Sequence, residues 1–214
     1  NRHDSVYVHL PRRMRDEHLL YTHIEVQAPP SSAIRQTVFM TDPTWAGIGQ
    51  MYWEYSPIPN YSGTELMLSD VALGQPDAQI GWERRGATLA LLPTRQVPSR
   101  AFDVYYEIYN LPEGNPYTTE ITVERLAGSS GRATEGGEPV SLHFAGESTA
   151  ASDGTMPELR RMGTSFEKGR YRMTVTIEDQ TTGKTASRAR IFEVQTSGRG
   201  ATMVPALPVA PLIR

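Results

Sequence analysis

Few side chains in this chain have the types and spacing that chemistry requires. His18 and His23 are close in sequence, but residues five apart on a strand point to opposite faces, so they are a weak zinc pair. Ser69 precedes Asp70 without the G-x-S-x-G turn that exposes a nucleophilic serine. The run Asp179–Gly183 lacks the acidic positions of a calcium loop and is typical of a hairpin turn. We therefore predict no catalytic residue, no metal ligand and no cofactor.

Aromatic side chains point to binding rather than catalysis. Trp45, Trp53 and Trp82 could line a carbohydrate groove, although we favour packing inside a β-sandwich as their interpretation. Tyr105 and Tyr109 flank a glutamate, and tyrosine-rich faces are common where proteins meet. The sequence therefore predicts Tyr105 and Tyr109 as contacts to a protein partner.

The C-terminal segment Met203–Arg214 repeats proline every third residue, which is the period of the polyproline II helix. Such a segment is a preformed extended arm with valine, leucine and isoleucine along one side. We expect it to lie either on the body of its own chain or on a partner. The arm residues that we predict to contact a partner are Val204, Pro205, Leu207, Pro208, Val209, Pro211, Leu212 and Ile213.

The elements that would position these residues are short strands. Apolar and polar residues alternate with period two in both arms of Phe102–Leu126, on either side of the Pro112–Pro116 loop. This alternation predicts a β-hairpin with one face in the core and the other, which carries Glu107, in water. The residues predicted to face the core in the first arm are Phe102, Val104, Tyr106 and Ile108.

Further strands are predicted on both sides of this hairpin. Gly169–Asp179 alternates cleanly and turns through residues 180–183 into a partner strand at Ala186–Gln195. No stretch of ten residues keeps the helical period, so we predict an all-β fold of two small antiparallel, immunoglobulin-like β-sandwich units with an extended Pro-rich C-terminal arm. The predicted division is 1–97 for the N-terminal unit and its connector, 98–197 for the second sandwich and 198–214 for the arm, with one larger sandwich as the alternative. Other predicted strands lie in residues 1–10, 20–27, 34–41, 51–55, 65–73 and 140–144.

Composition excludes several functional classes. A net charge of −3 gives no electrostatic case for binding nucleic acid or an anionic membrane surface. The chain of 214 residues has no cysteine, which excludes disulfides, thiol catalysis and cysteine zinc sites but leaves the compartment open. It contains no apolar run long enough to span a membrane as a helix. The first residue, Asn1, fits a mature protein after removal of a signal peptide, which we favour, with a trimmed chain as the alternative.

Several segments resemble, as a series, the β-rich C-terminal region of bacterial secreted GWxTD-domain proteins. The series consists of ELMLSDVAL at 65–73, LALLP at 89–93, FDVYYEIYNL at 102–111 and the strands of 169–194. The naming motif itself is absent, because Gly81-Trp82 is followed by Glu83-Arg84-Arg85. The resemblance covers about residues 65–195, and it implies an exported β-sandwich without any catalytic residues to carry over.

From these observations we expect a non-enzymatic structural or docking subunit that lies outside the cytoplasm, either periplasmic or secreted. Its partners would be protein subunits of a larger assembly, and it would reach a membrane only through them. An extrinsic subunit of a photosynthetic reaction centre with its antenna is one such setting, although no motif specifies it. The alternative is a carbohydrate-binding or hydrolase accessory β-sandwich domain, which would depend on the tryptophans and on paired acids.

Overall fold

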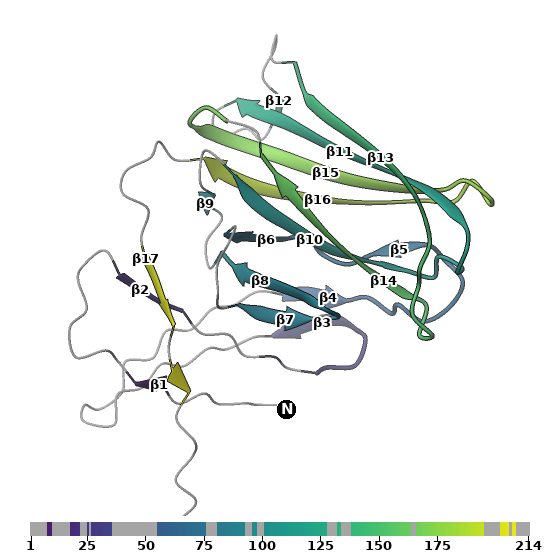
Figure 1. The fold of residues 1–214 in the computed structure, drawn as a ribbon, viewed down its shortest axis with the longest axis horizontal. Helices are drawn as coiled ribbons and strands as arrows, with labels where there is room; N and C mark the ends of the chain where they lie inside the picture. The colour runs from purple at the N-terminus through teal and green to yellow at the C-terminus, as the bar shows by residue number, and fades with distance from the viewer. Residues whose placement is uncertain are drawn as a thin grey trace, which may run out of the picture. The chain divides into compact units, whose positions relative to one another are not determined.

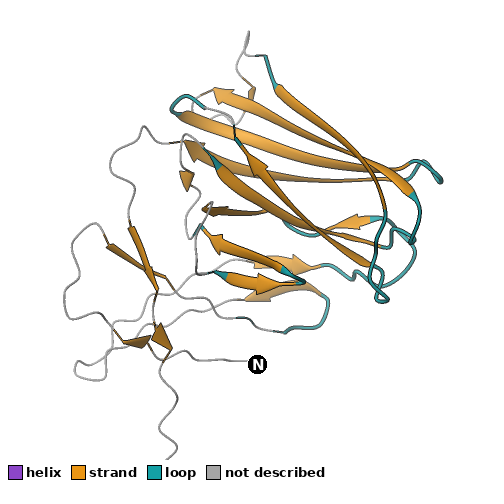
Figure 2. Cartoon of the chain, in the orientation of Figure 1, coloured by secondary structure: helices purple, strands orange, loops and turns teal. Residues whose placement is uncertain are grey.

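The computed structural model contains strands and loops and no helix among the residues that it describes (Figure 2). The described residues are 8–9, 18–21, 25, 27–35, 55–75, 81–92, 96–97, 101–127, 132–133, 138–163, 166–194, 202–205 and 207–208. The fold is therefore all-β, as the alternation predicts.

Two sheets form the sandwich that holds the core (Figure 1). The β10 sheet has the order β14-β10-β6-β8-β7, and β5 also pairs with β10. Its strands are β5 (Met67–Leu68), β6 (Ala72–Gln75), β7 (Trp82–Arg84), β8 (Ala87–Leu91), β10 (Phe102–Tyr109) and β14 (Thr155–Met162). The β15 sheet has the order β12-β11-β15-β16-β9, and β13 also pairs with β11. Its strands are β9 (Gln96–Val97), β11 (Pro116–Ala127), β12 (Arg132–Ala133), β13 (Val140–Glu147), β15 (Gly169–Asp179) and β16 (Thr185–Val194).

The predicted inward faces are confirmed. All four core residues predicted on β10 are fully buried, and the inward residues of β11 and β15 face them from the other sheet. An aromatic group of Phe102, Phe166, Tyr171 and Phe192 fills one part of this core, with ring centroids 5.3 Å apart for Phe102 and Phe192. Burial of such large apolar side chains is the main free energy that holds the two sheets together.

The prediction that Phe102–Leu126 is a hairpin is wrong. β10 pairs with β14, β5 and β6, whereas β11 pairs with β12, β13 and β15, so the loop at 110–115 carries the chain from one sheet to the other. Asn110 and Gly114 have positive φ in this loop, of 62° and 79°, which lets the chain turn sharply. Alternation indicates which side of a strand faces the core. Two consecutive strands in opposite sheets of a sandwich show the same alternation as the two arms of a hairpin, so the pattern does not distinguish the two arrangements.

The second predicted hairpin is confirmed. β15 and β16 pair antiparallel from Gly169 with Val194 to Glu178 with Thr185. Gly183, with φ of 69°, lies in the connecting turn, and Phe192 and Val194 are buried as expected. The alternation did not predict β14, because Pro157 and three charged residues interrupt its apolar pattern.

The observed division of the chain differs from the expected boundary at residue 97. One compact unit comprises Asn1–Val6 with Ile24–Ser62, and the other comprises Tyr7–His23 with Gly63–Arg214. Strands from residues 67–91 lie in the same sheet as β10, and Val97 belongs to the shared core, so the sandwich begins well before residue 97. In the first unit, β3 (Ser31–Arg35) and β4 (Tyr55–Ile58) pair antiparallel with a register shift.

Two small two-stranded sheets complete the second unit. β1 (Val8–His9) pairs antiparallel with β18 (Leu207–Pro208). β2 (His18–Tyr21) pairs in parallel with β17 (Thr202–Pro205). Both sheets join N-terminal residues to the C-terminal segment.

Candidate interaction site

Glu107 lies at the centre of a polar cluster on the face of β10 that points away from the core. Its side chain is only 2% exposed. Arg84 binds it with two donors, Nε to Oε1 at 2.5 Å and Nη2 to Oε2 at 3.0 Å. The Tyr105 hydroxyl donates to Oε1 at 2.8 Å, and the Tyr109 hydroxyl donates to Oε2. Each carboxylate oxygen therefore accepts hydrogen bonds from one arginine and one tyrosine.

The hairpin of β7 and β8 brings Arg84 to this cluster. Arg85 and Gly86 both have positive φ, of 48° and 80°, which is the backbone of a tight two-residue turn between antiparallel strands. Trp82 packs edge-on against Tyr105, with ring centroids 5.4 Å apart, and Arg84 lies 5.6 Å from the centre of the Trp82 ring. Arg85 donates to Asp153 at 2.6 Å. These contacts attach the hairpin turn to both β10 and the loop before β14.

The electrostatics of the cluster favour an ionised carboxylate. Burial alone would raise the pKa of Glu107, but hydrogen bonds from Arg84, Tyr109 and Tyr105 outweigh it and leave that pKa below its ordinary value. Burial and the contact with Glu107 raise the pKa of both tyrosine hydroxyls. The donors of Arg84, Tyr105 and Tyr109 all bind the Glu107 carboxylate, so both of its oxygens are engaged in hydrogen bonds. The cluster therefore connects strands of the sandwich.

A second polar cluster lies between the two sheets, beside β13 and β14. Glu158 accepts a hydrogen bond from the Tyr117 hydroxyl at 2.5 Å and pairs with Arg160 at 2.6 Å. The Arg160 guanidinium lies 5.0 Å from the ring centre of Phe144 on β13. Burial raises the pKa of the neighbouring Tyr106 to about 12. The cluster links β14 of one sheet with β11 and β13 of the other.

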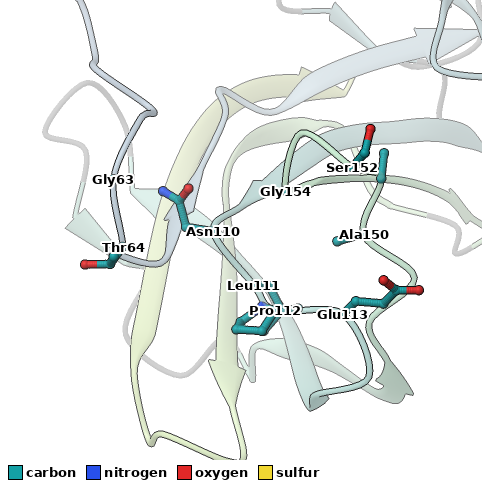
Figure 3. A pocket seen from close by; sticks show the side chains of 10 residues that line it. Gly63, Thr64, Asn110, Leu111, Pro112, Glu113, Ala150, Ser152 and Gly154 are labelled. Carbon is teal, nitrogen blue, oxygen red and sulfur yellow. The ribbon is translucent and has the colours of Figure 1, made fainter.

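Figure 3 shows an open hollow formed by three loops, with a volume of about 390 Å³. Asn110 lies on its wall, but its side-chain amide already donates to the carbonyl of Glu65 at 2.8 Å. Glu113 is the one charged residue among those that line it. The lining also includes the hydroxyl side chains of Thr64 and Ser152, and it includes no histidine and no lysine.

The tyrosines predicted to contact a partner do not form a docking face. Tyr105 is 2% exposed, Tyr109 is half-buried, and both hydroxyls bind Glu107. The face of β10 expected in water is buried, with Asp103, Tyr105 and Glu107 all less than 9% exposed. The signal that could have indicated this burial is the spacing Tyr-x-Glu-x-Tyr, because alternate residues of a strand share one face and two hydroxyls can then reach one carboxylate.

The C-terminal segment is a strand where it is described, rather than a free polyproline arm. Val204 and Pro205 pair with Leu20 and Tyr21 in the β17–β2 sheet. Leu207 and Pro208 pair with His9 and Val8 in the β18–β1 sheet. The structure therefore agrees with the alternative that the segment lies on its own chain. The remaining predicted contacts Val209, Pro211, Leu212 and Ile213 lie outside the described residues.

Removing residues 202–214 should have a local effect. We expect the melting temperature of the sandwich to change by less than about 2 °C, because none of the described core residues lies in this segment. Amide hydrogen exchange should accelerate at residues 18–21, which lose their paired strand. Truncation that unfolds the sandwich would contradict this prediction, and so would unchanged exchange at residues 18–21.

The other candidate residues have structural roles where they are described. The Ser69 hydroxyl accepts from the backbone N–H of Glu107 at 2.9 Å and donates to the carbonyl of Asp70, which agrees with a strand-end pair. The Asp179 carboxylate accepts from Thr181 and Thr182 within its hairpin turn. No group of three or more potential metal ligands is found in the described part of the chain. Trp45, Trp53 and His23 lie outside the described residues.

Three long strands have an edge without a paired strand among the described residues. β13 and β14, of eight residues each, pair on one side only. β16, of ten residues, pairs with β9 only at Glu193 and Val194. Unpaired edges expose N–H and C=O groups to which another strand can bind. They are the candidate interaction sites of the sandwich.

The described strands thus define an all-β protein with a sandwich core. No family model and no curated protein matches the chain. Among solved structures it is similar to the PmoD soluble domain from Methylocystis sp. (Rockwell), with 18% identity, coverage of 58% of this chain and 89% of that one, and a TM-score of 0.31. The described residues include no helix that could cross a membrane.

Proposed function

We propose that this chain is a non-enzymatic structural or docking subunit of a larger protein assembly outside the cytoplasm. The observation that carries the proposal is the way in which the buried carboxylates are bound. Glu107 binds one arginine and two tyrosines, Glu158 binds one arginine and one tyrosine, and Asp103 pairs with Arg161 at 3.0 Å. Such groups connect strands of the sandwich, and none of these three carboxylates is among the residues that line the described hollow.

The long open edges support the docking role. A strand edge can take a partner segment through backbone hydrogen bonds alone, which suits a subunit that is attached to a larger complex. The resemblance of residues 65–195 to exported GWxTD-domain proteins supports a location outside the cytoplasm. A membrane complex that holds the chain through its protein subunits fits this proposal, with a photosynthetic reaction centre and its antenna as one example.

Native purification tests the proposal directly. A tagged chain isolated from its own cells should elute with the same protein partners at fixed stoichiometry, before and after gentle membrane solubilisation. An unrelated exported sandwich domain with the same tag is the control for nonspecific capture. Elution of the chain without partners under every condition would contradict a docking role. Specific binding on a glycan array would instead favour the carbohydrate-binding alternative.

A further inference from the structure

The three open edges differ in how they are protected against pairing with another strand. Natural sheets protect their edges with prolines and with charged side chains that point inward. β14 contains Pro157 and places Glu158 and Arg160 opposite the core residues Tyr106 and Val104. β16 places Arg188 and Arg190 opposite the core residues Val175 and Met173. Both edges therefore carry inward-pointing charges.

β13 has none of these protective features. Its sequence, VSLHFAGE, contains no proline, lysine or arginine. Its inward positions are Val140, Leu142, Phe144 and Gly146, opposite Val123, Ile121, Thr119 and Tyr117 of β11. The single acidic residue, Glu147, lies at the end of the strand. An eight-residue edge of this composition is suited to backbone pairing.

The hydrogen-bond pattern determines which groups of β13 are available. The Ser148 N–H donates to the carbonyl of Asn115 at 2.9 Å, and ladder bonds alternate along an antiparallel pair. The inward residues of β13 therefore bond to β11. The residues whose N–H and C=O groups point to the open edge are Ser141, His143, Ala145 and Glu147.

We propose that β13 pairs antiparallel with β13 of a second copy of this chain, about a two-fold axis at Phe144. A two-fold axis perpendicular to the sheet places residues opposite each other only if they share a face. An axis at His143 would place Glu147 opposite Pro139, which has no N–H to donate. An axis at Phe144 places Ser141 opposite Glu147 and His143 opposite Ala145, so that every open N–H and C=O of these residues finds a partner.

Side chains in this register are complementary. On the inward face, Leu142 of each copy lies opposite the small Gly146 of the other. The two Phe144 residues lie opposite each other at the axis, each with Arg160 of its own copy 5.0 Å from its ring centre. On the outward face, Glu147 lies opposite Ser141, so no like charges are placed directly opposite each other. Ser141 and His143 already contact Glu120 of β11, at 2.8 and 3.7 Å, so this half-exposed acid has its partners within its own copy. The side-chain pairing along β13 therefore favours a second copy of this chain as the occupant.

This inference goes beyond the proposed docking function, because it concerns the purified chain alone. Self-association can fail while native partners are still captured, and the reverse can also occur. The two proposals are therefore tested independently.

Two matched proline substitutions test the edge. Ala145 and Ala189 are both exposed alanines on edge strands. The N–H of Asp179 donates to the carbonyl of Lys184, so the same alternation directs the Ala189 N–H toward the open edge of β16. In each case proline removes a donor that the fold of the single chain does not use.

Sedimentation equilibrium should show a dimer for the unmodified chain and for Ala189→Pro. Ala145→Pro should weaken dimerisation by about tenfold or more, because each copy loses a donor and gains a ring at the contact. Circular dichroism and melting curves establish that both variants are folded. A monomer at every concentration tested would overturn the proposal. The proposal would also be overturned if both variants weakened dimerisation equally. It would be overturned likewise if only Ala189→Pro weakened dimerisation.

Cysteine cross-linking tests the register, since the chain has no cysteine of its own. Opposed residues at the axis have Cβ atoms close enough for a disulfide. Under mild oxidation, Phe144→Cys should form a cross-linked dimer more efficiently than His143→Cys. Preferential cross-linking of His143→Cys would overturn the Phe144 axis, and cross-linking of neither variant would overturn the pairing of β13 with itself.

Discussion

Replacing Glu107 with alanine should lower the free energy of unfolding by about 2 to 3 kcal/mol, although this glutamate belongs to the polar face of its strand. The carboxylate is 2% exposed and accepts hydrogen bonds from Arg84, Tyr105 and Tyr109. Without it, the Arg84 guanidinium, which is 34% exposed, and two tyrosine hydroxyls lose their acceptor, and the β7–β8 hairpin loses its attachment to β10. Urea denaturation followed by tryptophan fluorescence measures the change.

Two further variants separate the causes. Glu107→Gln keeps the size of the side chain but replaces one acceptor oxygen with a donor group, so it should lose most of the same free energy. Glu120→Gln removes a carboxylate that is 47% exposed and should change the free energy of unfolding by less than about 0.5 kcal/mol. A loss below about 1 kcal/mol for Glu107→Ala would show that the cluster does not stabilise the fold.

The same cluster makes stability depend on pH. Since the folded state lowers the pKa of Glu107, its ionised form contributes stability above the unfolded value of about 4.3. This contribution should be lost as the pH falls through the lower folded pKa. The unmodified chain should therefore lose more stability on acidification than Glu107→Gln does.

Replacing Ile108 with aspartate should prevent the sandwich from folding. Ile108 is fully buried in the core between the two sheets, and an aspartate there would be an unpaired charge without hydrogen-bond partners. The expected loss of more than about 5 kcal/mol equals or exceeds the stability of many domains. Circular dichroism and proteolysis of the purified variant should show an unfolded chain.

Val140→Asp is the matched control, because Val140 is also an apolar strand residue but is 37% exposed. This variant should fold, with a modest loss of stability. A folded Ile108→Asp variant with a similar melting temperature would mean that the inward face of β10 is misassigned.

The sequence alone determined the fold class and the inward faces of the long strands. Alternation of Phe102 to Ile108 and of Tyr171 to Ile177 correctly separated core residues from their neighbours, because successive side chains of a strand point to opposite faces. The prolines and glycine of 112–116 and the single glycine of 180–183 indicate the loops there for a similarly local reason, since backbone geometry at those residues disfavours a continued ladder. These properties depend on residues close in sequence.

Which strands pair, and which outward faces are covered, depends on residues that are far apart in the chain. β10 and β11 belong to different sheets because β14 and β15, from later in the chain, pair beside them. Glu107 can be buried because Arg84 binds its carboxylate and compensates its negative charge. Arg84 lies on β7, which does not pair with β10 directly in the sheet. The C-terminal segment pairs with residues near the other end of the chain. Each of these outcomes is a contact between distant residues, and alternation within one strand carries no information about its partner.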